Sequence, residues 1–194
     1  MPWEKQFNPD VALDKAMNAF WARGYVATSM QDLTECMGIN RGSLYATFGD
    51  KRHLFIQALR RYDALHRDQW AEELLRRAGS PRKAITMVFD DAVNRLVKPG
   101  GRDGCLLVNT ALELSAHDKE ISEIVGQGLL QMEEFFRAMI KNGQDAGEIP
   151  DNVAPLDTAR SLLSLLLGLR VLSRSRPERG LFRSVAKQAE ALLT

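Results

Sequence analysis

Apolar residues recur three or four positions apart along most of the chain, and this spacing restricts the fold more than any other feature. Near the start, Val11, Ala12, Ala16, Ala19 and Phe20 form one such stripe, which is the pattern of an amphipathic helix. No stretch alternates with period two for long enough to predict a strand, and no internal repeat is visible. The sequence therefore predicts an all-α protein.

Capping residues and glycines predict where the helices begin and end. Asn8 or Asp10 can cap the first helix, which Gly24 ends, and Asp50 can cap a long fourth helix. The predicted helices cover about residues 9–23, 30–37, 41–47, 51–78, 81–96, 104–116, 118–146, 155–174 and 177 onward.

Two of these short helices flank a tight turn at Gly38, and the second begins at residues 40–43 with Asn-Arg-Gly-Ser. This is the spacing of a helix-turn-helix, whose second helix enters the major groove of DNA. Arg41 can donate two hydrogen bonds to guanine, and Ser43 can reach a base or a phosphate. A phosphate contact is also expected at Lys51, which begins the next helix.

The net charge of +1 conceals an uneven distribution. A neutral total argues against a nucleic-acid partner, but residues 41–61 contain five basic residues and one acidic residue, while residues 104–158 carry a net charge of −7. Such asymmetry points to an anionic partner. A basic run is more often only a solvated surface, so charge alone does not decide the function.

The motif as a whole resembles a known family. Residues 27–33 (Ala-Thr-Ser-Met-Gln-Asp-Leu) and 37–51, which run from Met-Gly-Ile to Gly-Asp-Lys, resemble the N-terminal domain of the TetR family of bacterial repressors. Residues 19–25 are similar to the family's first helix and its exit. The resemblance implies a homodimer that binds a palindromic, double-stranded operator and releases it when a small molecule occupies the C-terminal domain.

The resemblance also implies two domains and a set of DNA contacts. We expect a helix-turn-helix domain at residues 1–50, joined through the long fourth helix to a helical effector-binding and dimerisation domain at 51–194. Phosphate contacts are expected from Thr28, Tyr45 and Lys51, although Tyr45 could be a surface aromatic. The expected DNA-binding residues are Thr28, Ser29, Asn40, Arg41, Gly42, Ser43, Tyr45, Ala46, Thr47 and Lys51. Thr47 stands where the family often has His, which leaves the preferred base sequence unpredicted.

The rest of the chain shows no catalytic motif. The three histidines lack Cys or carboxylate partners at metal-ligand spacing, so neither an enzyme, a cofactor nor a metal site is predicted. A helical enzyme and a helical adaptor for a protein or membrane are the alternatives to a regulator, and a steep salt dependence of DNA binding would distinguish the regulator.

Cys105 follows Gly104 at a predicted helix start. A helix N-terminus favours the thiolate, which is the reactive form, and Gly-Cys-Leu at this place resembles electrophile- and oxidant-sensing members of the family. Release from DNA by thiol modification is therefore an alternative to release by a bound molecule. A cysteine here is more often a small buried apolar residue, and Asp103 would oppose a thiolate.

Aromatic and apolar residues of the central helices are candidates for effector contact, although each is more often a core residue. The candidates are Tyr62, Leu65, His66, Trp70, Phe89, Cys105, Leu107, Thr110, Phe135, Phe136 and Leu166. They suggest an aromatic, apolar or electrophilic effector.

Residues 162–172 are apolar nearly all round, so we expect them to serve both the core and a dimer interface. The expected interface residues are Leu162, Leu165, Leu169, Leu172, Phe182 and Val185. The run is about half the ~20 residues of a membrane helix. Two cysteines fit a reducing compartment, and the polar start lacks the apolar run of a signal peptide. A cytoplasmic protein without membrane contact is expected.

Overall fold

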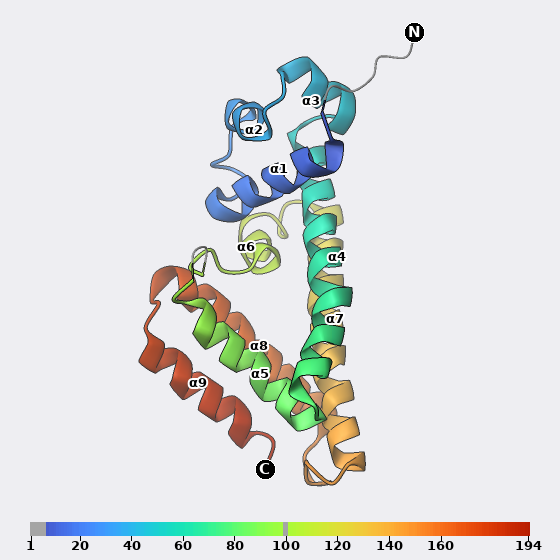
Figure 1. Ribbon diagram of the computed structural model, residues 1–194, viewed down its shortest axis with the longest axis vertical. Coiled ribbons are helices and arrows are strands. Elements are labelled where there is room, and N and C mark those ends of the chain that lie inside the picture. Colours follow the sequence, from blue (N-terminus) through green and yellow to red (C-terminus); the bar gives the residue numbers. More distant parts are fainter. Residues whose placement is uncertain (1–6, 99–100) are drawn as a thin grey trace.

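The computed structural model describes residues 7–98 and 101–194, except for the side chains of residues 66–72. Every regular element in these ranges is a helix, so the predicted all-α fold is confirmed (Figure 1). The helices are α1 (Pro9–Arg23), α2 (Met30–Met37), α3 (Arg41–Phe48), α4 (Lys51–Ala78), α5 (Pro81–Arg95), α6 (Leu106–Glu113), α7 (Lys119–Asp145), α8 (Pro155–Ser175) and α9 (Arg179–Ala191).

Side-chain caps fix several helix starts. Asn8, rather than Asp10, caps α1, because its side chain accepts hydrogen bonds from the first backbone N–H groups of that helix. Ser29 caps α2 in a capping box with Asp32. The predicted range of 104–116 for α6 is too long, because Gly104 has a φ of 75° and cannot belong to a right-handed helix.

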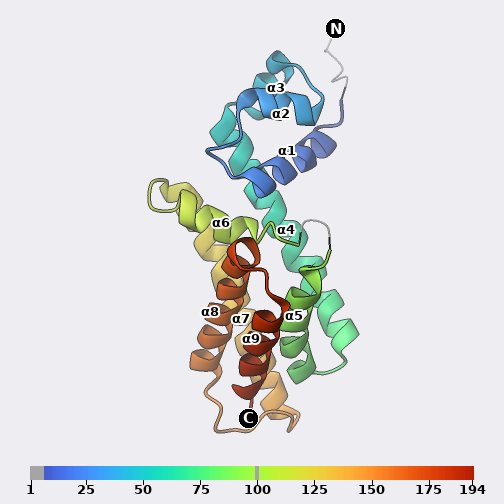
Figure 2. The ribbon, with the colours of Figure 1, turned by 90° about the vertical axis from the view of Figure 1, so that its left-hand side faces the viewer.

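Helices α1 to α3 and the start of α4 form a unit at one end of the molecule, which we call the head (Figures 1 and 2). Their apolar stripes meet in one core, where Phe20, Leu33, Leu44 and Phe55 are at most 1% exposed. Gly38 permits the tight turn between α2 and α3, because its φ of 72° lies in the left-handed region.

The rest of the molecule, which we call the body, continues from the head along α4 (Figure 1). In the body α7 packs along α8 and α5 packs along α9, and Phe89, Phe136 and Phe182 lie in their shared core. The head does not have a core of its own, because Leu106 of α6 and Ile121 of α7 belong to the same apolar cluster as the head residues. Packing therefore couples the position of the head to α6 and α7.

The apolar run of α8 lies deeper in this core than expected. Three of the six expected interface residues are at most 1% exposed within one chain, namely Leu162, Leu169 and Phe182. Their side chains cannot contact a second copy directly, so this part of the interface prediction is wrong. Leu165, Leu172 and Val185 stay partly exposed. In the described ranges, no helix combines the length and apolar content that crossing a membrane requires.

Candidate nucleic-acid interface and ligand cavity

Helix α3 presents a polar face to solvent because two large apolar residues hold its opposite face in the core. Leu44 and Phe48 are 0% and 4% exposed, and their spacing of four places them on one side of the helix. The exposed positions are Asn40, Arg41, Gly42, Tyr45 and Ala46, with Ser43 and Thr47 partly exposed. Among them, Gly42 and Ala46 are small enough for the backbone to approach another surface closely.

Arg41 and Tyr45 lie one turn apart on this face and contact each other. Nη2 of Arg41 is 3.5 Å from the Tyr45 hydroxyl, and the guanidinium carbon is 5.7 Å from the ring centroid. Asn40 caps the helix by accepting from the N–H of Ser43 at 2.8 Å. The positive end of the helix dipole therefore lies beside Arg41, where it favours a negatively charged partner.

Thr28 does not belong to this surface, and its expected phosphate contact is wrong. The residue is 0% exposed, and its hydroxyl donates a hydrogen bond to the carbonyl of Gly24 at 2.6 Å. Its role is to close the turn between α1 and α2. Ser29 is exposed, but its hydroxyl is engaged with Asp32 in the cap of α2.

Lys51 lies at the start of α4, beside the exit from α1. Its ammonium nitrogen is 4.4 Å from the centroid of the Tyr25 ring. Partial burial lowers the pKa of Lys51 below its ordinary value. A phosphate contact by this residue stays a prediction.

A cavity of about 180 Å³ lies in the body between α4, α5, the start of α6, α7 and α8. It brings together five of the expected effector residues: Tyr62, Cys105, Leu107, Phe135 and Leu166. Phe89, Thr110 and Phe136 do not line it; each is at most 1% exposed and packs inside the body, which corrects that part of the prediction. Leu65 is 41% exposed and lies outside the lining, and the side chains of His66 and Trp70 lie outside the described residues.

Two arginines that the sequence did not single out also line the cavity, Arg95 at the end of α5 and Arg170 on α8. The only available signal was that Arg170 interrupts the apolar run of α8, because a charge on a largely buried helix needs a partner. No ion pair joins either guanidinium to a carboxylate of the described residues, and both arginines are partly exposed. The described side chains also include no group of three His, Cys, Asp or Glu residues that could hold a metal ion.

Tyr62 and Cys105 meet at the wall of this cavity. The Tyr62 hydroxyl donates a hydrogen bond to Sγ of Cys105 over 3.5 Å. Burial raises the pKa of Tyr62 well above its ordinary value and the adjacent thiol adds to the rise, while Arg170 and Arg95 partly offset it. The phenol is therefore protonated at neutral pH and serves as a donor.

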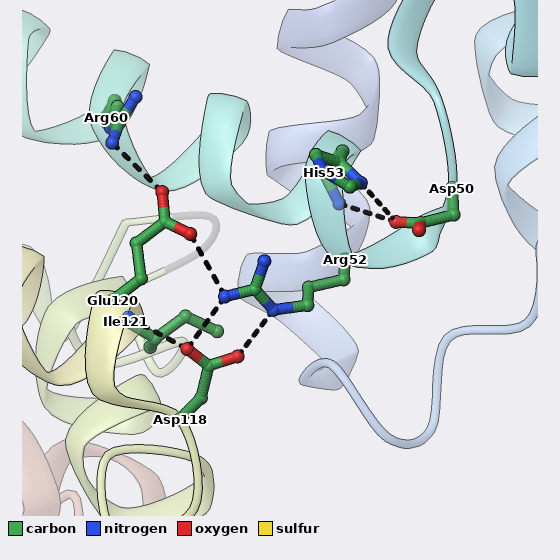
Figure 3. A network of polar contacts seen from close by, with 7 residues as sticks. All are labelled: Asp50, Arg52, His53, Arg60, Asp118, Glu120 and Ile121. Atoms are coloured by element: carbon green, nitrogen blue, oxygen red, sulfur yellow. Dashed lines mark hydrogen bonds and ion pairs between the residues drawn. The ribbon is translucent and has the colours of Figure 1, made fainter.

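Ion pairs join α4 to the start of α7 (Figure 3). Nε of Arg52 is 2.6 Å from Oδ2 of Asp118, and its Nη2 is 3.0 Å from Oε2 of Glu120. Arg60 reaches Glu120 at 3.1 Å. The hydrogen bond from Arg52 lowers the pKa of Asp118 to about 2. Because Asp118 also caps α7 through the N–H of Ile121, one carboxylate joins the helix start to the ion pair.

A second set of polar contacts joins α6 to the head. The Glu113 carboxylate, at the end of α6, accepts hydrogen bonds from the backbone N–H groups of Tyr25 at 3.0 Å and Val26 at 2.7 Å. The loop that leaves α1 is thereby held by a helix whose other end lines the cavity. The Trp21 ring of α1 also packs edge-on against Tyr62, with the centroids 5.0 Å apart. These contacts connect the cavity to the head.

Two protein-family models match the chain. A model described as bacterial regulatory proteins of the tetR family matches residues 12–58. A tetracyclin repressor-like C-terminal domain matches residues 81–187. The first match includes α2 and α3, and the second includes most of the body.

Curated proteins and solved structures agree with these matches. YezE of Bacillus subtilis (strain 168), an uncharacterized HTH-type transcriptional regulator, is 34% identical over 75% of this chain and 74% of its own length. The HTH-type transcriptional repressor ComR of Escherichia coli (strain K12) is 30% identical over 88% of this chain and 81% of its own. A cysteine mutant of the regulator CifR, solved with 26-bp operator DNA, is 28% identical with a TM-score of 0.85 over 98% of both chains. The reduced form of E. coli NemR, 21% identical, has the same fold with a TM-score of 0.84 over 95% of this chain and 96% of its own.

Proposed function

The chain belongs to the TetR family of bacterial regulatory proteins, and on that basis we propose that it is a repressor that binds a palindromic operator as a homodimer. A small molecule in the cavity, or modification of the Cys105 thiol, releases it from DNA. ComR is named a repressor, and the CifR structure contains operator DNA. The same family membership supports a cytoplasmic regulator that has no catalytic activity.

The exposed face of α3 is the observation that carries this proposal. We assign base reading to Arg41, whose guanidinium can donate two hydrogen bonds to guanine, and phosphate contacts to Tyr45 and Lys51. The rest of the interface is assigned to Ser29, Asn40, Gly42, Ser43, Ala46 and Thr47. In this assignment residues 1–50 form the DNA-binding domain, and residues 51–194 bind the effector and the second copy.

The dimer interface is assigned to the outward faces of α8 and α9. Leu165, Leu172 and Val185 pack against the core and keep part of their surface exposed. Val171 on the same helix is 42% exposed. Burial of these apolar groups against a second copy would stabilise the pair.

We assign the release of DNA to a movement of α6, because one end of this helix lines the cavity and its other end contacts the head. The start of this helix lines the cavity, and Glu113 at its end holds the loop between α1 and α2. Because α6 has only eight residues, we expect a ligand that displaces its start to displace Glu113 as well. The loop and the reading helix would follow, which alters the spacing of two heads on one operator.

Thiol modification would act on the same helix, since Cys105 is its N-cap residue. An adduct on Sγ displaces the Tyr62 hydroxyl that donates to it. The Cys105→Ser variant is expected to lose oxidant-induced release, while Cys36→Ser, which changes an exposed thiol of the head, keeps it. An unchanged oxidant response in Cys105→Ser excludes the thiol route.

The proposed function is tested by titrating the protein onto a duplex that carries a mapped genomic site and onto a scrambled duplex. Specific binding should weaken steeply with salt, because phosphate contacts displace counterions. Arg41→Ala should cost about 1–3 kcal/mol on the specific duplex only. An equal loss of affinity for both duplexes would show that Arg41 makes only a nonspecific electrostatic contact. No DNA binding by the wild type at low salt would contradict the proposed function.

A further inference from the structure

The polar groups of the cavity gather around the Tyr62 hydroxyl. Cys105 accepts its hydrogen bond, and Arg95 and Arg170 both lie close enough to act on its charge. Most of the remaining lining is apolar, including Leu107, Met132, Phe135 and Leu166. The cavity therefore combines one cationic region with an apolar wall.

Arg95 and Arg170 are partly exposed, and neither forms an ion pair with a carboxylate of the described residues, so a ligand anion in the cavity can bind them without displacing an acidic side chain. Asp63 is the one acid among the described lining residues. Asp63 already takes part in another interaction. Its Oδ1 lies close to α7, because it is 3.1 Å from the point that a Cβ on Gly128 would occupy. The charge of the two arginines is thus left for a ligand.

We propose that the effector is a small amphipathic carboxylate, whose carboxylate group binds Arg95 and Arg170 and whose apolar part lies against α7 and α8. This inference rests on the proposed function and names the ligand class for its cavity. Guanidinium groups suit a carboxylate because they offer paired N–H donors in one plane. The protonated Tyr62 hydroxyl supplies a further donor beside them.

The volume of the cavity sets the size of the acid. A dry apolar cavity of roughly 150 Å³ holds benzene, and the cavity here measures about 180 Å³. Benzoate or a short straight-chain fatty acid matches that space.

Arg95 also connects such a ligand to the head. Its guanidinium lies 5.5 Å from the centroid of the Trp21 ring on α1. A bidentate carboxylate is a stronger partner for this group than an aromatic face. A carboxylate bound to Arg95 therefore acts on a group that also contacts α1.

The experiment is calorimetric titration of the full-length wild-type protein with benzoate and with straight-chain acids from acetate to octanoate. The matching amides serve as neutral probes of the same shape. At least one acid should bind, and its amide should bind at least tenfold more weakly. Arg170→Gln and Arg95→Gln should each lower the affinity at least tenfold. Arg174→Gln removes the same charge one turn further along α8, outside the lining, and should leave the affinity unchanged.

Melting curves and operator titration of each variant show that it is folded. Equal affinity for acid and amide would overturn the inference, as would wild-type affinity in a folded Arg170→Gln variant or the absence of binding by every acid. None of these outcomes changes operator binding by the wild type, so each would contradict the ligand class and leave the proposed function as a DNA-binding repressor intact. Loss of the proposed function would appear instead as a wild-type protein that binds the acid but no DNA.

Discussion

The Glu113 carboxylate is expected to hold the head against the body, so Glu113→Ala should destabilise the protein and loosen the head. The substitution removes the acceptor for two backbone N–H groups, those of Tyr25 and Val26. It leaves the helix propensity of α6 intact, because alanine is the best helix former. A loss of stability in this variant therefore measures the two hydrogen bonds to the head and not a weaker α6.

The size of the effect follows from the surroundings of the two hydrogen bonds. A hydrogen bond to a charged group contributes about 1.5–3 kcal/mol. The Val26 bond lies in exposed surroundings, where water replaces the carboxylate, while the Tyr25 bond is partly buried. We expect a total loss of about 2 kcal/mol, which lowers the melting temperature of a chain of this size by about 4–8 °C.

Urea unfolding at fixed protein concentration measures this loss, and hydrogen exchange of the Tyr25 and Val26 amides locates it. Glu123→Ala is the matched control. It removes an exposed carboxylate of α7 that lies 3.9 Å from Lys119, and such surface changes usually stay within about 0.5 kcal/mol. If Glu113→Ala unfolds at the same urea concentration as the control, and the two amides exchange no faster, the tie does not hold the head.

Three further substitutions test other parts of the structure. Asn40→Ala removes the cap on the Ser43 N–H and should cost about 1 kcal/mol together with specific DNA affinity; unchanged melting and operator titration would contradict this. Asp118→Asn keeps a capping side chain but removes the charge that faces Arg52. Because the pKa of Asp118 falls from 3.8 to about 2 on folding, its stabilisation is full above pH 4 and is lost as the pH falls toward 2. The difference in urea midpoint between wild type and this variant should shrink over that range, and a constant difference would refute the ion-pair role. Gly104→Ala forces a side chain into a φ of 75°, with its Cβ 3.2 Å from a carbonyl oxygen of α8, and should cost about 1–2 kcal/mol; an unchanged melting temperature would contradict that strain.

Local features were predictable from the sequence because local chemistry determines them. Helix limits followed from caps such as Asn40 and from glycines such as Gly38, whose effects reach only a few residues. The helix-turn-helix motif and its family were recognisable for the same reason. The exposed face of α3 follows from the spacing of Leu44 and Phe48 alone.

Features that depend on packing between distant helices were not predictable in this way. Thr28 looks like a surface residue in the motif, but the turn after α1 buries it. Leu162 and Leu165 have similar sequence surroundings, yet only the fold decides which of them faces the core. Arg95 and Arg170 are 75 residues apart, and only the packing of α5 and α8 brings them to one cavity.

Mapping of the DNA that the protein occupies in cells, with wild type and Arg41→Ala side by side, tests the central claim most directly. The account predicts sites that share an inverted repeat, with half-site centres separated by a whole number of helical turns of about 10–10.5 bp. Arg41→Ala should lose these sites while the protein stays folded. The absence of any shared inverted repeat, or the same occupancy in the Arg41→Ala variant, would contradict the assignment of α3 as the reading helix of a dimeric repressor.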